Sequence, residues 1–214
     1  MKKIITGCLG IWLGLISCVN GTPHQYIELK SGICVPQEKQ GVHYKNAPYF
    51  SAELGLSWEA WRLGLQLGYV KYESKDILRG DFHDTVFGHP DYKDKRFTAF
   101  SIMANIYHDW IFHEGLNFYV GCGLGVTRLN YRFYNVNEDL FECNEVYNQD
   151  KCLLAVQLMC GISYALNDHW SVSMGYRCMK MENVKYNTIE NAGVWPSLET
   201  PLLHSLEVGL RYSF

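Results

Sequence analysis

The sequence predicts an all-β protein, an eight-stranded antiparallel up-and-down β-barrel whose strands cross a membrane. Three observations lead to this fold class. Eight segments alternate apolar with polar residues at a period of two, and long and short connections alternate between these segments. The polar faces carry mainly Gly, Ser, Ala and Thr with isolated charges. Because a strand face in water normally carries many Lys and Glu, the apolar faces are expected to look outward into lipid.

In the first four segments, apolar residues occupy every second position and fall on one face of a strand. These segments are residues 25–35, 48–58, 61–73 and 96–110. Their apolar positions include Ile27, Leu29, Ile33, Phe50, Leu54, Leu56, Leu63, Leu65, Leu67, Phe100, Ile102 and Ile106. Segments of about ten residues are long enough to cross a bilayer when they are tilted.

The last four segments repeat the pattern over residues 117–135, 151–167, 170–181 and 204–214. The final one is the clearest, with His, Leu, Val, Leu, Tyr and Phe at even positions and Ser, Glu, Gly, Arg and Ser at odd ones. One segment alternating over five residues is weak evidence. Eight such segments, separated by connections that alternate regularly between long and short, are strong evidence together.

The connections predict two different rims. Residues 36–47, 74–95, 136–150 and about 184–200 are long and polar, whereas 59–60, 111–116 and 167–169 are short. Membrane barrels have short turns in the periplasm and long loops outside the cell. An even number of strands places both ends of the barrel at the periplasmic rim.

The main rival is a soluble eight-stranded barrel of lipocalin type, with apolar residues inside and polar residues outside. The small residues of the polar faces argue against it. So do the aromatic residues that bound the apolar faces near the short turns, as expected for a belt at a membrane interface. These are Trp58, Trp61, Trp110, Phe118, Tyr164, Trp170, Tyr212 and Phe214.

Residues 1–21 predict an export signal, and residues 22–214 the barrel domain. Lys2 and Lys3 are followed by an apolar run at 4–16 and then by small residues. The run is shorter than the roughly 20 residues of a membrane-spanning helix. Two cleavage sites remain open. Leu15-Ile16-Ser17-Cys18 resembles a lipobox, which would leave a lipidated Cys18, and the alternative is ordinary cleavage after Gly21.

Six of the eight cysteines remain after this signal. Cys143 and Cys152 flank a polar stretch, so we predict a disulfide that closes a loop outside the cell, where disulfides persist. Cys122, Cys160 and Cys178 fall on apolar faces and are expected to act as small hydrophobic residues.

The inward faces carry four carboxylates and four cations: Glu28, Lys30, Glu53, Arg62, Asp109, Arg177, Glu207 and Arg211. An eight-stranded wall encloses a lumen just wide enough for side chains. Because charges shielded from water need partners, we predict a polar network that plugs the lumen. Its expected members are Glu53, Arg62, Arg177, Glu207 and Arg211. The alternative is that these charges are solvated near the rims.

This organisation resembles that of small outer-membrane barrels, namely the transmembrane domain of OmpA, OmpX and the Opa adhesins. The resemblance covers residues 25–214 and rests on topology, alternation and a closing strand that ends in Tyr212-Ser213-Phe214. It implies the outer membrane of a Gram-negative bacterium and surrounding lipid. It also implies periplasmic chaperones and the barrel-assembly machinery as partners.

The functional prediction is membrane anchoring and display of four surface loops, with adhesion or host interaction as the specific hypothesis. The loops carry aromatic residues among polar ones, which suits recognition. These aromatic residues are Phe82, Phe87, His89, Tyr92, Phe141, Tyr147 and Trp195. The alternative is that the loops only close and shield the outer rim. A net charge of −3 gives no reason to expect nucleic acid.

A narrow channel and a lipid-modifying enzyme are the alternatives. Adjacent strand residues such as His204 and Ser205 point to opposite faces and cannot act together. His83, Asp84, Thr85, His89 and Asp91 offer catalytic or metal-binding groups in the second long loop, but nothing in the sequence fixes their geometry. We therefore expect no catalytic residue, no metal and no cofactor.

Overall fold

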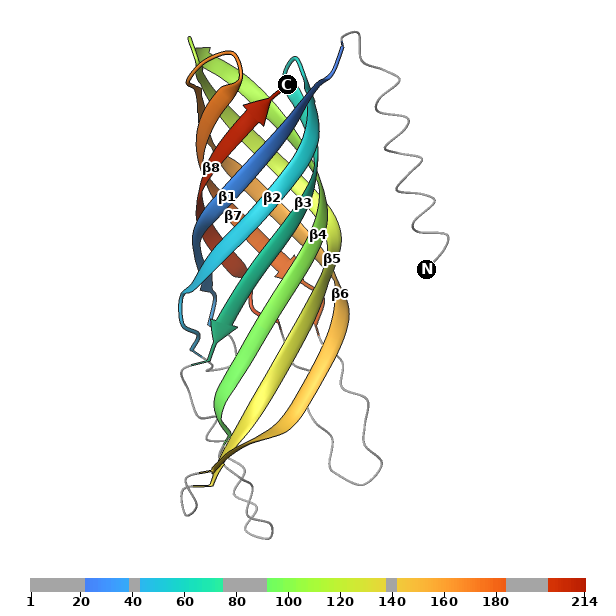
Figure 1. Ribbon diagram of the computed structural model, residues 1–214, viewed down its shortest axis with the longest axis vertical. Helices are drawn as coiled ribbons and strands as arrows, with labels where there is room; N and C mark the ends of the chain where they lie inside the picture. Colours follow the sequence, from blue (N-terminus) through green and yellow to red (C-terminus); the bar gives the residue numbers. More distant parts are fainter. Residues whose placement is uncertain (1–21, 39–42, 75–91, 138–141, 184–199) are drawn as a thin grey trace, which may run out of the picture.

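A computed structural model describes residues 22–38, 43–74, 92–137, 142–183 and 200–214. Its strands follow chain order around a closed antiparallel barrel, with β8 pairing back to β1 (Figure 1). They are β1 (His24–Pro36), β2 (Ala47–Trp58), β3 (Trp61–Glu73), β4 (Tyr92–His113), β5 (Leu116–Asn137), β6 (Glu142–Ala165), β7 (Trp170–Met181) and β8 (Leu203–Ser213). The predicted fold class is confirmed.

Tight turns join the strands at the end of the barrel that we call the short-turn rim, the upper end in Figure 1. Glu59 and Ala60 connect β2 to β3, and Glu114 and Gly115 connect β4 to β5. Glu59 and Gly115 have φ angles of 47° and 80°. Two-residue hairpins favour such positive φ angles because they match the twist of the strands. β1 begins and β8 ends at this rim, opposite the long-loop rim.

The wall turns its apolar face outward. On the exterior, Leu54, Leu158 and Leu206 are 62%, 65% and 67% exposed. In the interior, Glu53 and Arg62 are 1% and 2% exposed. A soluble barrel has the reverse arrangement, because apolar side chains leave water for its core. The exterior is therefore built to contact hydrocarbon, as the alternation predicts.

Three strands are longer than the sequence indicates. β4, β5 and β6 have 22, 22 and 24 residues, and they continue past the end of β3 at the long-loop rim (Figure 1). We call residues 92–95, 133–137 and 142–147 the β4–β6 extension. The predicted loop 136–150 is thus wrong for residues 136–137 and 142–150, which are strand. Beyond the membrane a strand needs only a pairing neighbour and no apolar face, so its sequence resembles a loop.

No helix in the described ranges is long and apolar enough to cross a membrane. Residues 1–21, with the predicted export signal and Cys18, lie outside the described residues, as do His83, Asp84, Thr85, His89 and Asp91.

The interior has an apolar core at its long-loop end, which the sequence analysis did not predict. We call this group the apolar layer. Its members are buried: Cys34, Tyr44, Ala47, Tyr49, Val70, Tyr72, Phe97, Ala99, Met103, Leu129, Tyr131, Leu153, Ala155, Met179, Met181 and Leu203. Nearer the short-turn rim, buried polar and charged side chains fill the space, and we call them the polar layer.

Candidate functional site

Glu28 is the hub of the polar layer, and its side chain is fully shielded from solvent. One carboxylate oxygen, Oε2, lies 3.4 Å from Lys30 Nζ, 3.3 Å from Arg211 Nη2 and 3.7 Å from Arg62 Nη1. Ser173 Oγ donates a hydrogen bond of 2.8 Å to Oε1. The barrel's closure positions this cluster, because Glu28 on β1 is the register partner of Arg211 on β8. One carboxylate thus forms ion pairs with three cations.

Glu53 forms a second cluster with neutral donors. Its carboxylate accepts hydrogen bonds of 2.7 Å from the Tyr26 hydroxyl, 2.7 Å from Asn105 Nδ2 and 2.6 Å from the Tyr107 hydroxyl. Gly64 makes room for this group, since a Cβ there would lie 2.5 Å from Glu53 Cδ. Hydrogen bonds to a buried carboxylate replace the water it has lost.

Arg62 connects the clusters to the short-turn rim. Its guanidinium forms a bidentate pair with Asp109, with Nε and Nη2 at 2.6 Å and 2.9 Å from the two carboxylate oxygens. It also lies over the rings of Tyr107 and Tyr119, 4.5 Å and 5.1 Å from their centroids. Such fork-like pairing with aromatic stacking is characteristic of arginine and fixes the geometry.

Arg177 lies at the boundary between the polar and apolar layers. Its Nε is 2.7 Å from Glu207 Oε1, an ion pair without hydrogen-bond alignment. Its Nη2 donates a hydrogen bond of 3.1 Å to Ser205 Oγ. The guanidinium carbon lies 3.5 Å from the centroid of the Tyr49 ring, which belongs to the apolar layer.

Amide side chains cross the lumen between these clusters. Gln157 Nε2 donates to Asn105 Oδ1 at 2.7 Å and to Gln66 Oε1 at 2.9 Å. Gln66 Nε2 donates in turn to Ser51 Oγ at 3.2 Å. The chain joins β6, β4, β3 and β2, so side chains from distant parts of the wall meet in the middle of the barrel.

An aromatic group closes the apolar layer toward the long-loop rim. Tyr72 and Phe97 stack with ring centroids 5.1 Å apart. Tyr44, which precedes β2, packs edge-on against both at 5.7 Å and 6.0 Å. Burial raises the pKa of Tyr44 to about 12, so it stays neutral at physiological pH. Two unlike layers therefore fill the interior in series.

All five residues expected in the network lie in the interior, but not as one cluster. Arg62 and Arg211 share Glu28, and Arg177 pairs with Glu207. Glu53 bonds to hydroxyl and amide groups. Sequence reasoning placed Glu28 inward but missed its central role, because strand register is invisible in one sequence. Sequence reasoning also missed the apolar layer, although the pattern of apolar outward and polar inward residues breaks down at Met179, Met181 and Leu203, which point inward.

The predicted Cys143–Cys152 disulfide is contradicted. Both cysteines belong to β6, nine residues apart, and Cys152 is a free thiol. Nine residues of strand span about 30 Å, whereas a disulfide needs Cα atoms within about 7 Å. The prediction failed because it assumed a loop between the two.

His204 and Ser205 lie on opposite faces of β8. The Tyr176 hydroxyl bonds to His204 on the exterior, and Ser205 is buried against Arg177. Among the residues that the structure describes, no three His, Cys, Asp or Glu side chains gather as metal ligands.

Residues 23–194 match the family of the outer membrane protein beta-barrel domain, and the chain belongs to this family. The fold and the membership make the protein a bacterial outer-membrane β-barrel. The chain is 25% identical over 135 residues to uncharacterised proteins of Brucella abortus strain 2308 and Brucella suis strain 1330, covering 55% of this chain. It spans about half the length, 48%, of these curated relatives.

Two solved structures show the same fold. Neisserial surface protein A aligns with a TM-score of 0.59 at 15% identity, over 89% of this chain and 97% of that one. Ail, the attachment invasion locus protein of Yersinia pestis, aligns with a TM-score of 0.50 at 11% identity, over 91% and 100%. At these identities the likeness concerns the fold alone.

Proposed function

We propose that the protein is a closed membrane anchor that displays its long-loop rim at the cell surface. In this proposal the β4–β6 extension contacts a ligand on a host or neighbouring surface. The observation that carries the proposal is the extension itself, which continues the wall beyond the end of β3 (Figure 1). A paired sheet holds its residues in place more firmly than a loop, and binding groups commonly lie on such rigid scaffolds.

The base of the extension carries polar groups on its outer face. Arg128 Nη2 donates to Asp150 Oδ2 at 2.8 Å, and Asn130 Nδ2 donates to Asp150 Oδ1 at 3.1 Å. These residues replace the apolar exterior found at Val126 and Leu154, two to four residues closer to the membrane. The change from apolar to polar marks where the sheet leaves the bilayer.

A barrel of similar fold supports a role in contact with other surfaces. The attachment invasion locus protein of Yersinia pestis was determined in complex with the heparin analogue sucrose octasulfate. A barrel of this fold can therefore be a binding protein, which is what we propose for this chain.

The two alternatives have less support. A narrow channel needs a continuous path, and the polar and apolar layers lie across it in series. A lipid-modifying enzyme needs a nucleophile and a base close together, whereas His204 and Ser205 face opposite sides of the wall.

Removing the extension tests the proposal. Tyr131 and Gln149 are register partners on β5 and β6, so residues 132–148 can be replaced by an Asn-Gly turn between them. Bacteria that express this trimmed variant should adhere to epithelial cell monolayers several-fold less than bacteria with the intact protein. The matched control carries an Asn-Gly insertion in the short turn at Asp168. Equal adherence of all three strains, at equal amounts of folded barrel, would contradict the proposal.

A further inference from the structure

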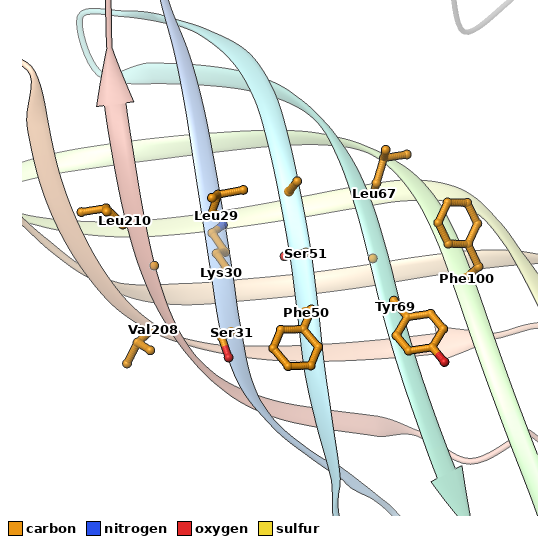
Figure 2. Close-up of a pocket in the computed structure, with 13 residues that line it drawn as sticks. Leu29, Lys30, Ser31, Phe50, Ser51, Leu67, Tyr69, Phe100, Val208 and Leu210 are labelled. Carbon is orange, nitrogen blue, oxygen red and sulfur yellow. The ribbon is translucent and has the colours of Figure 1, made fainter.

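The exterior of the barrel carries an apolar hollow over β8, β1, β2, β3 and β4 (Figure 2). The hollow exists because two outward positions hold small residues among large neighbours. Ser31 lies between Phe50 and Val208 in the register, and Ala52 lies between Leu29 and Leu67. The exposed side chains that surround it are Leu29, Phe50, Tyr69, Phe100, Val208 and Leu210.

A second hollow continues the first toward the long-loop rim. The two share Phe50 and Tyr69, which Figure 2 shows side by side on neighbouring strands. The lining of the second hollow includes Lys45, Lys71 and Glu73, so its chemistry differs from that of the first. Lys71 follows Tyr69 by two residues on β3, which places it about 7 Å farther along the strand.

Two of the three described charged residues that line this second hollow are cations. Glu73 pairs with Lys45 at 3.3 Å and with Arg96 at 3.2 Å. Lys71 is exposed and forms no ion pair with any residue that the structure describes. The described charged residues that line this hollow, Lys45, Lys71 and Glu73, carry a net charge of +1. The apolar hollow therefore ends beside these lysines, at the level along the barrel where the exterior changes from apolar to polar residues.

We propose that these two hollows form a binding site for the phosphorylated glycolipid of the outer leaflet. An acyl chain lies in the apolar hollow, and a phosphate group of the same molecule contacts Lys45 and Lys71. The orientation supports this, because the long-loop rim is the outer side of such barrels and faces that leaflet. Clustered Lys and Arg at a membrane surface attract anionic lipid headgroups. The site is independent of the β4–β6 extension and of any ligand bound there.

Native mass spectrometry of the full-length protein in phosphatidylcholine nanodiscs containing diphosphorylated lipid A tests the site. Two variants target it: Lys45→Gln with Lys71→Gln removes the positive charge, and Ala52→Phe fills the apolar hollow. Arg128→Gln is the matched control, because it removes a rim cation on β5 that lines neither hollow. The folding of each variant is checked by whether the barrel keeps its resistance to heat denaturation.

We expect the intact protein and Arg128→Gln to retain lipid A equally. The double lysine variant should retain it about tenfold less, since each lysine near the surface contributes to headgroup attraction. Ala52→Phe should also reduce the retention of lipid A. Fully dephosphorylated lipid A should bind weakly to the intact protein, to the same degree as diphosphorylated lipid A binds to the double lysine variant. Equal retention by all variants would overturn the proposal. So would protein dimers that replace lipid adducts and disappear in Ala52→Phe, because the hollow would then be an interface between two copies.

Discussion

The two layers of the interior achieve closure by different physical means. In the polar layer each group depends on a specific partner, as Glu28 depends on its cations and Glu53 on three donors. In the apolar layer, Tyr72, Phe97 and Leu129 depend on the volume they fill. A missing partner in a shielded region leaves an unpaired charge, whereas a missing apolar group leaves a cavity. The polar layer should therefore be the more sensitive to a single conservative substitution.

The largest effect is expected for Glu28→Gln. The change preserves shape but removes the charge that Lys30, Arg62 and Arg211 share. Loss of one partner from a buried ionic cluster lowers the free energy of unfolding by about 3–5 kcal/mol. Urea unfolding of the refolded protein in phosphatidylcholine vesicles, followed by tryptophan fluorescence, measures this. A loss below about 1 kcal/mol would mean that water solvates the cluster.

A smaller effect is expected for Leu129→Ala in the apolar layer. Leu129 is fully buried, so truncation should lower the free energy of unfolding by about 2–4 kcal/mol. Since no charge is involved, the loss should be the same at low and high salt. The same urea titration at two salt concentrations tests this. A loss that changes with salt would show that the layers are not energetically distinct.

The smallest effect is expected at the long-loop rim, for Glu73→Gln. Glu73 pairs with Lys45 and Arg96, but unlike Glu28 it is partly exposed. Pairs exposed to solvent contribute less than about 1 kcal/mol because water and salt screen them. In the same urea assay, a loss equal to that of Glu28→Gln would remove the contrast between shielded and solvated charge.

The sequence was sufficient for the strands and their orientation because a period of two is a local property of the chain. Leu54 and Glu53 are neighbours, and their opposite burial follows from alternation alone. Contacts across the lumen are not local. Glu28 meets Arg211 and Ser173 only because the barrel closes with one particular register.

The same reasoning explains the three failures. The β4–β6 extension is held by pairing between strands, so it lacks the apolar face that identifies a membrane strand. The predicted Cys143–Cys152 disulfide required a loop between the two cysteines, and it is wrong because that segment is part of β6. The apolar layer was missed because the inward faces were expected to carry mainly small residues and isolated charges, whereas Leu129 and Tyr131 also point inward.

Single-channel recording of the refolded protein in planar phosphatidylcholine bilayers tests the closed interior most directly. With the polar and apolar layers filling the lumen in series, the intact protein should give no stable conductance steps above the bilayer baseline. Stable open steps of the size of a general porin would show a continuous water-filled path and would contradict the account.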